Sequence, residues 1–159
     1  MSKLLIKNPT IINEGKRFRK NLLIDGEKII SISSNIKTDV NTEIINAEGL
    51  ILIPGMIDDQ VHFREPGLTH KGNIFSESKA AVAGGVTSYI EMPNTNPNTT
   101  SVEEFNKKIT IASNDSFSNF SFMFGGTNDN IDEIKKLNPS EVAGIKLFLG
   151  SSTGKMLID

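Results

Sequence analysis

Short apolar runs separated by turn residues fill the first third of the chain. Asp25-Gly26 lies between two of these runs, and this pair is a strong signal for a β-hairpin. Runs of this length that are rich in Ile and Leu and bounded by turn residues predict strands. The predicted strands are Ser2–Lys7, Asn21–Asp25, Lys28–Ser34, Thr42–Asn46 and Leu50–Ile53. We therefore expect residues 1–53 to form a small all-β unit.

After Pro54-Gly55 the pattern changes to strands that alternate with helices. The predicted strands are Met56–Phe63, Val86–Met92, Phe117–Phe124 and Val142–Leu149. The predicted helices are Phe75–Ala83, 101–112 and Ile131–Leu137. This order predicts a mostly parallel sheet with crossover helices. Four strands fit either a small open α/β sheet or the first half of a (β/α)8 barrel, since a complete barrel needs about 250 residues.

The composition of the chain excludes several classes of function. The chain has 159 residues, of which 37% are hydrophobic and 23% charged, and this balance is typical of a globular protein. A net charge of −2 gives no basic surface for nucleic acid or for a polybasic membrane contact. The absence of cysteine excludes disulfides and thiolate chemistry. No apolar run is long enough to span a bilayer and the N-terminus does not fit a signal peptide, so we expect a cytoplasmic protein.

Polar residues alternate along the predicted strand that follows Pro54-Gly55. They are Asp58, Gln60, His62 and Arg64, and a regular strand would place them on one face. His62 offers a metal an imidazole nitrogen, and Gln60 offers a weaker amide oxygen. Arg64 offers a planar fork for a carboxylate. The pattern fits equally well a site at the end of a barrel strand and an edge strand with a solvated polar face.

Two further motifs follow later strands. In the segment Met92-Pro-Asn-Thr-Asn-Pro97, two prolines stiffen the loop around Asn94, whose amide suits a substrate carboxylate or ring. Taken alone, an ordinary rigid turn is the simpler interpretation. Lys146 lies in an apolar strand, where burial would favour its neutral amine. Such an amine can react with carbon dioxide to give a carbamate that bridges two metals, although a solvent-facing or ion-paired lysine is the simpler interpretation.

Together these motifs resemble the N-terminal portion of a dihydroorotase, in the cyclic amidohydrolase group of the amidohydrolase superfamily. Residues 54–67 resemble the metal-binding signature of the first barrel strand, residues 92–97 the second-strand loop, and residues 144–146 the strand with the carbamylated lysine. Residues 1–53 resemble the N-terminal part of a small composite β domain. The resemblance implies an α/β fold in which residues 54–159 form the first half of a TIM-like (β/α)8 barrel.

The resemblance also implies roles for individual residues. His62 would bind the more buried metal, usually zinc, and Lys146, as a carbamate, would bridge two zinc ions. Arg64 and Asn94 would hold the substrate's α-carboxylate. The reaction would be the reversible interconversion of N-carbamoyl-L-aspartate and dihydroorotate in pyrimidine biosynthesis. The full-length protein would form homo-oligomers and associate with aspartate transcarbamoylase.

The sequence departs from the family pattern in two ways. Gln60 stands where the family has the first histidine of His-x-His, which predicts that one metal binds weakly or not at all. The family's later histidine ligands and its aspartate general base belong to strands beyond the fourth, and thus beyond Asp159. We therefore expect no catalytic base in these 159 residues and no activity of this chain alone. His70 matches no ligand position and is interpreted as a loop histidine.

Three alternatives remain open. Another cyclic amidase, such as an allantoinase or a hydantoinase, is close in chemistry, although its second-strand loop differs. A non-catalytic dihydroorotase-like scaffold would explain Gln60. The third alternative is a small open α/β domain in which the motifs occur by accident. For a half barrel we also expect exposed edges at the first and fourth strands, which favours pairing with other chains.

Overall fold

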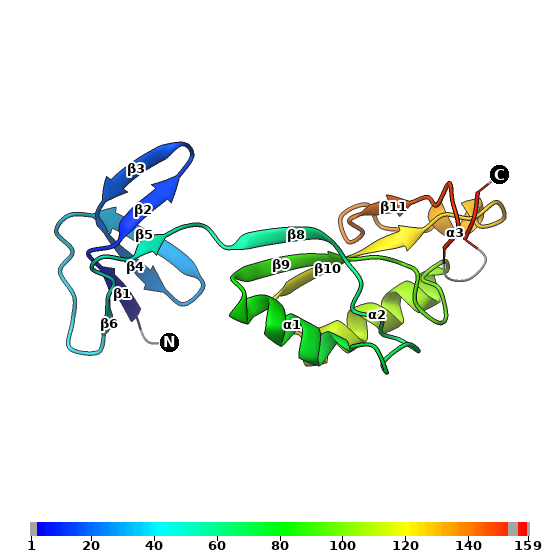
Figure 1. Ribbon diagram of the computed structural model, residues 1–159, viewed down its shortest axis with the longest axis horizontal. Helices are drawn as coiled ribbons and strands as arrows, with labels where there is room; N and C mark the ends of the chain where they lie inside the picture. Colours follow the sequence, from blue (N-terminus) through cyan, green and yellow to red (C-terminus); the bar gives the residue numbers. More distant parts are fainter. Residues whose placement is uncertain (1–2, 153–155, 159) are drawn as a thin grey trace. The chain divides into compact units, whose positions relative to one another are not determined.

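The structure is a computed structural model that describes residues 3–152 and 156–158. These residues form two compact units, one ending at Pro54 and the other beginning at Gly55. Figure 1 labels most of the elements along the chain. The first unit contains β1 (Lys3–Lys7), β2 (Thr10–Asn13), β3 (Lys16–Arg19), β4 (Asn21–Asp25), β5 (Lys28–Ser33), β6 (Glu43–Asn46) and β7 (Ile51–Leu52). The second contains β8 (Met56–Val61), α1 (Ile74–Ala83), β9 (Val86–Glu91), α2 (Val102–Asp115), β10 (Asn119–Gly125), α3 (Ile131–Ile134) and β11 (Gly144–Lys146).

Two of the boundaries expected from the sequence fall outside the described residues. The first strand was predicted to begin at Ser2, and the barrel segment was predicted to extend to Asp159. Both positions lie outside residues 3–152 and 156–158, so these two limits stay predictions. The division between the two units, by contrast, falls at Pro54 and Gly55, where the sequence pattern changes.

The first unit consists of two small sheets, with strand orders β5-β4-β1-β6 and β3-β2-β7. The predicted hairpin at Asp25-Gly26 is confirmed, since β4 and β5 pair antiparallel on either side of it. The sequence did not reveal the hairpin of β2 and β3, because β3 is three-quarters basic and carries little apolar signal. Its turn residues Glu14 and Gly15 have φ angles of 48° and 71°, which is the backbone that a tight hairpin requires.

The second unit is a parallel sheet in which strands that follow one another along the chain are also neighbours in space. The order is β11-β10-β9-β8, and α1 and α2 pack against each other and against β9 and β10. Both helices cover the same side of the sheet (Figure 1). An open doubly wound sheet carries helices on both faces, whereas a barrel carries them only outside. This arrangement is therefore that of a barrel segment.

The core of the second unit lies between the sheet and the two long helices. It is largely aromatic, and Tyr89, Phe122 and Phe124 are almost completely buried. Its buried residues are Phe63, Ile74, Tyr89, Phe105, Ala112, Phe122 and Phe124. Because Phe63 belongs to this core, the chain just beyond β8 is held against the barrel wall. This anchors the polar residues on either side of Phe63.

The strand β8 is shorter and less regular than predicted. It ends at Val61 rather than at Phe63, and its pairing register with β9 shifts between Asp58 and Val61. A register shift of this kind places an extra residue in one strand and breaks the alternation of side chains. Asp58, Gln60, His62 and Arg64 therefore do not form the simple alternating row that the sequence predicts.

The last two elements are also shorter than predicted. The helix α3 ends at Ile134, because Lys136 and Leu137 donate to carbonyls only three residues back. The strand β11 is limited to Gly144–Lys146, and Phe148 instead forms an isolated parallel bridge with Leu157. Among the helices that the structure describes, none has the length and apolar character needed to cross a bilayer.

Candidate functional site

A cavity of about 490 Å³ lies at the carboxyl ends of the parallel strands. It is lined by His62, Arg64, Asn94, Phe148, Ser151 and Ser152. The first two follow β8, Asn94 follows β9, and the others follow β11. Ligands of parallel α/β sheets bind at this edge, because the loops after the strands converge there. Three of the five site residues predicted from the sequence thus line one cavity.

His62 and Asn94 are joined directly by a hydrogen bond. The distance between Nδ1 of His62 and Oδ1 of Asn94 is 2.9 Å. An amide oxygen only accepts, so Nδ1 carries the proton and Nε2 keeps its lone pair. A histidine that binds a metal usually donates its other ring N–H in this manner. Because this contact uses Oδ1 of Asn94, the Nδ2 group can donate its hydrogen bonds to an anion.

The surroundings of His62 favour its neutral form. Partial burial and then the positive charge of Arg64 lower the pKa of His62, and the charge of Lys146 acts in the same direction. The hydrogen bond with Asn94 opposes these effects. A neutral imidazole is the form that binds a metal ion.

Arg64 lies in a tight turn that follows β8. Its φ angle is 71°, a left-handed backbone that residues with a side chain rarely adopt. Its backbone N–H donates to Oε1 of Glu91 at 3.0 Å. The turn places the Arg64 side chain in the wall of the cavity. A guanidinium at this place suits a carboxylate ligand.

Gln60 and Lys146 lie beside each other across the sheet. The Lys146 amine donates to Oε1 of Gln60 at 3.4 Å, and it lies 5.6 Å from the ring centre of Phe148. Gln60 is exposed and Lys146 is half-buried. The predicted site residues outside the cavity wall therefore form a pair with each other. His70 lies in an exposed turn, as interpreted from the sequence.

These side chains do not make a complete metal site. Within residues 3–152 and 156–158, no cluster of three or more His, Cys, Asp or Glu side chains is arranged to hold a metal ion. His62 and Lys146 are two possible ligands, whereas tight zinc sites use three or four. The described residues therefore do not fit zinc by themselves.

The resemblance implies that the catalytic base lies outside these residues. By that resemblance it is expected beyond Asp159, and Asp159 itself lies outside the residues that the structure describes. The expectation that the general base lies beyond this residue therefore stays a prediction. The described residues contribute to the site the cavity wall and the pair of Gln60 and Lys146.

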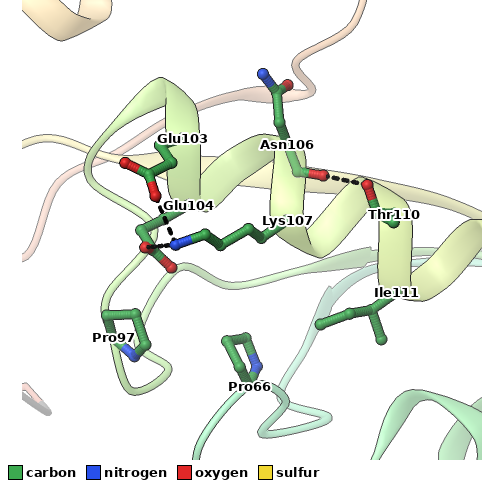
Figure 2. A pocket seen from close by; sticks show the side chains of 8 residues that line it. All are labelled: Pro66, Pro97, Glu103, Glu104, Asn106, Lys107, Thr110 and Ile111. Carbon is green, nitrogen blue, oxygen red and sulfur yellow. Dashed lines mark hydrogen bonds and ion pairs between the residues drawn. The ribbon is translucent and has the colours of Figure 1, made fainter.

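A second groove, of about 640 Å³, lies between the two loops and α2. Figure 2 shows its lining residues, which include Pro66 and Pro97 from the loops that follow β8 and β9. The Lys107 amine in this groove lies 2.7 Å from Oε1 of Glu103 and 2.8 Å from Oε1 of Glu104. Its cation is thus already paired with two carboxylates, so the groove is a poor site for an anionic substrate.

Sequence reasoning did not identify the cavity residues that follow β11. Phe148, Ser151 and Ser152 complete the wall of the cavity that Asn94 also lines. The available signal was their position, directly after the strand that carries Lys146, since loops after barrel strands line the active site.

The buried pair of Glu91 and Lys108 was also missed. Its signal was a lysine at helical spacing from Phe105 and Ala112, on the apolar face of α2. A charged residue at such a position is buried only with a partner, which would have directed attention to Glu91 at the end of β9.

Comparisons with known proteins agree with the resemblance to dihydroorotases. Residues 49–119 match the family described as Dihydro-orotase-like. The chain is 35% identical over its whole length to a dihydroorotase from Methanosarcina acetivorans, and it covers 34% of that protein. Over 59% of the chain, it is 50% identical to a dihydroorotase from Carboxydothermus hydrogenoformans, of which the match covers 22%.

The fold resembles solved structures of cyclic amide hydrolases. An L-hydantoinase (dihydropyrimidinase) from Arthrobacter aurescens matches 99% of this chain with a TM-score of 0.91 and 28% identity, and the match covers 35% of that structure. A dihydropyrimidinase from Brevibacillus agri matches 99% of this chain with a TM-score of 0.83 and 27% identity, over 35% of its own length. The predicted fold class, the first half of an amidohydrolase barrel preceded by part of a small β domain, is thus confirmed.

The fold and these similarities relate the chain to the cyclic amidohydrolases. Over residues 49–119 it matches the dihydroorotase-like family, and the whole chain is similar to an N-terminal portion of dihydroorotases. The chain spans about a third of the length of the dihydroorotase that it matches end to end.

Proposed function

We propose that this chain supplies the carboxylate-binding part of a dihydroorotase active site, which interconverts N-carbamoyl-L-aspartate and dihydroorotate in pyrimidine biosynthesis. The observation that carries the proposal is the cavity in which Arg64 and Asn94 lie together. The similarity to named dihydroorotases supports the choice of substrate.

The two proposed binding residues suit an α-carboxylate in complementary ways. The guanidinium of Arg64 presents two parallel N–H donors, which match the two oxygens of a carboxylate. Asn94 adds the donors of its Nδ2 group, and its hydrogen bond to His62 fixes the direction of the amide. Holding the carboxylate at two points orients the rest of the substrate and lowers the entropic cost of reaction.

The metal-binding part of the proposed site involves fewer well-suited residues of this chain. We propose His62 and Lys146, the latter as a carbamate, as the two zinc-binding groups of this chain, with Gln60 as a poor third ligand. Two good ligands are fewer than a tight zinc site needs. We therefore expect the 159-residue chain to bind substrate more readily than it turns substrate over.

A binding experiment tests the proposed function. N-carbamoyl-L-aspartate is titrated into the chain and the heat of binding is measured, with hydantoin, which lacks a carboxylate, as the comparison ligand. We expect Arg64→Gln to weaken binding of N-carbamoyl-L-aspartate about tenfold or more, since a charged hydrogen bond contributes about 1.5–3 kcal/mol. The control variant Arg19→Gln removes an exposed arginine paired with Glu48 and should leave binding unchanged.

Two other functions have specific support, and the same measurements separate them. The similarity to hydantoinase structures favours a hydantoinase-type enzyme, which would bind hydantoin in preference to N-carbamoyl-L-aspartate. Gln60, at the position where the family has a histidine, favours a non-catalytic scaffold, which would bind neither ligand. Preference for the carboxylate ligand would exclude both.

A further inference from the structure

A buried ion pair lies directly beneath the candidate site. Oε2 of Glu91, the last residue of β9, lies 2.6 Å from the amine of Lys108 in α2, and both side chains are fully buried. Burial raises the pKa of Glu91 and lowers that of Lys108, while their mutual attraction opposes both shifts. Such a pair contributes little net stability compared with apolar residues of the same volume. Its position therefore calls for another explanation.

Each partner of this pair holds one of the two loops that form the cavity. The other carboxylate oxygen of Glu91 accepts the backbone N–H of Arg64 at 3.0 Å, within the left-handed turn after β8. The amine of Lys108 donates to the carbonyl oxygen of Met92 at 3.1 Å, two residues before Asn94. The ion pair thus links the backbone beside one proposed carboxylate-binding residue to the backbone beside the other.

The two loops also contact each other directly. The backbone N–H of Asn96 donates to the carbonyl oxygen of Pro66 at 3.1 Å. Gly67 lies so close to Asn96 that an added Cβ would stand 1.7 Å from its carbonyl oxygen. The loops are therefore fixed at their bases by the ion pair and further along by backbone contact.

We infer that Glu91 is a positioning residue that holds Arg64 in place beside Asn94, and through this supports the selection of a carboxylate-bearing substrate. Glu91 acts by accepting the Arg64 N–H, which stabilises a backbone conformation that an arginine would not otherwise hold. Lys108 is the counter-ion that lets the Glu91 carboxylate be buried in its charged form. The inference rests on the proposed function, but its structural part is tested without any ligand.

The test compares two double variants that both remove the buried charges. Glu91→Gln with Lys108→Met keeps an oxygen that accepts the Arg64 N–H, whereas Glu91→Leu with Lys108→Met does not. Neither variant leaves a buried unpaired charge, so both are expected to fold. Should the leucine variant fail to fold, Glu91→Asp replaces it in the same comparison, because it keeps the negative charge but shortens the side chain that reaches the Arg64 N–H.

The first readout is hydrogen exchange of the Arg64 backbone amide, measured by NMR on the 159-residue chain. We expect exchange at this amide to be at least tenfold faster in the leucine variant and within threefold of the wild type in the glutamine variant. The amides of Phe122 and Phe124 in β10 should exchange alike in both variants. An Arg64 amide equally protected in both variants, or a loss of protection that spreads equally to β10, would overturn the inference.

The second readout is the affinity for N-carbamoyl-L-aspartate. If the wild type binds this ligand, the leucine variant should bind it at least tenfold more weakly and the glutamine variant within threefold of the wild type. Equal affinity of the two variants would contradict the positioning role. If the wild type does not bind the ligand, the proposed function fails, while the amide exchange of Arg64 still decides whether Glu91 positions that residue.

Discussion

Tyr89 is the only tyrosine in the sequence and lies in the core of the second unit. Its ring centre is 4.5 Å from that of Phe63, and its hydroxyl donates to the Ser116 hydroxyl at 3.3 Å. Burial raises the pKa of Tyr89 from its ordinary value of 10.0 to about 12, because the phenolate cannot be hydrated there. A single chromophore thus reports on the packing beneath the site.

We predict that Tyr89 ionises near pH 12 in the folded chain and near pH 10 in the urea-unfolded chain, measured by the ultraviolet absorbance of tyrosinate. Since the folded pKa is the higher one, its contribution to stability is complete below about pH 10 and is lost as the pH rises towards 12. Titration of the folded chain at the unfolded value would show that the ring is not buried.

Gln60 gives a second prediction at the residue scale. We predict that Gln60→His raises the zinc affinity of the chain at least tenfold, because imidazole is a better zinc ligand than an amide oxygen and about 1.4 kcal/mol suffices for this change. Competition with a coloured chelator measures the affinity. His70→Ala is the control and should change nothing, whereas adding His62→Ala should remove the gain. A gain that survives the loss of His62 would place the zinc elsewhere.

At the scale of elements, the sequence predicted which segments are strands and helices better than where they end. The order of strands and helices from β8 to β11 followed from apolar periodicity, because each element buries one face in the core. Apolar periodicity did not predict the short lengths of β11 and α3. Beyond β11, Phe148 pairs with Leu157, and beyond α3, the N–H groups of Lys136 and Leu137 donate to carbonyls three residues back. The left-handed turn at Arg64 was equally hidden, because its cause is the Glu91 carboxylate, distant in sequence.

The contact between the two site loops is testable at one glycine. Gly67 has a φ of 79° and abuts the backbone of Asn96, whereas Gly85 has a φ of 87° with open space around it. We predict that Gly85→Ala costs only the conformational penalty of about 1–2 kcal/mol. Gly67→Ala should cost clearly more, because the new methyl group must also push the two loops apart. Urea unfolding measures both, and equal losses would show that the loops do not touch.

At the scale of the whole molecule, the parallel sheet of the second unit has two open edges. In the described part of the chain, β8 and β11 each have a neighbouring strand on one side only. Apolar side chains on and beside these strands are exposed, among them Ile57 at 68% and Leu149 at 82%. Unpaired strand edges with apolar side chains favour association between chains.

We predict that the chain self-associates as its concentration rises and that Ile57→Lys shifts the midpoint at least tenfold towards higher concentration. A charge on an edge strand opposes pairing with a second edge. Sedimentation velocity measures the association. Val40→Lys is the matched control, because Val40 is 99% exposed but lies outside every strand of the described residues. A monomer at all concentrations, or an equal effect of the two variants, would contradict this prediction.

The consecutive order of β8, β9, β10 and β11 has a consequence for synthesis. Each new strand can add to the one made just before it, so pairing never has to wait for a distant segment, and contacts between near neighbours form quickly. On a ribosome, where polypeptides emerge from the amino end, the sheet can grow strand by strand as translation proceeds. The side of the pocket that carries Arg64 and Asn94 would then take shape before Phe148, Ser151 and Ser152 are added to its wall.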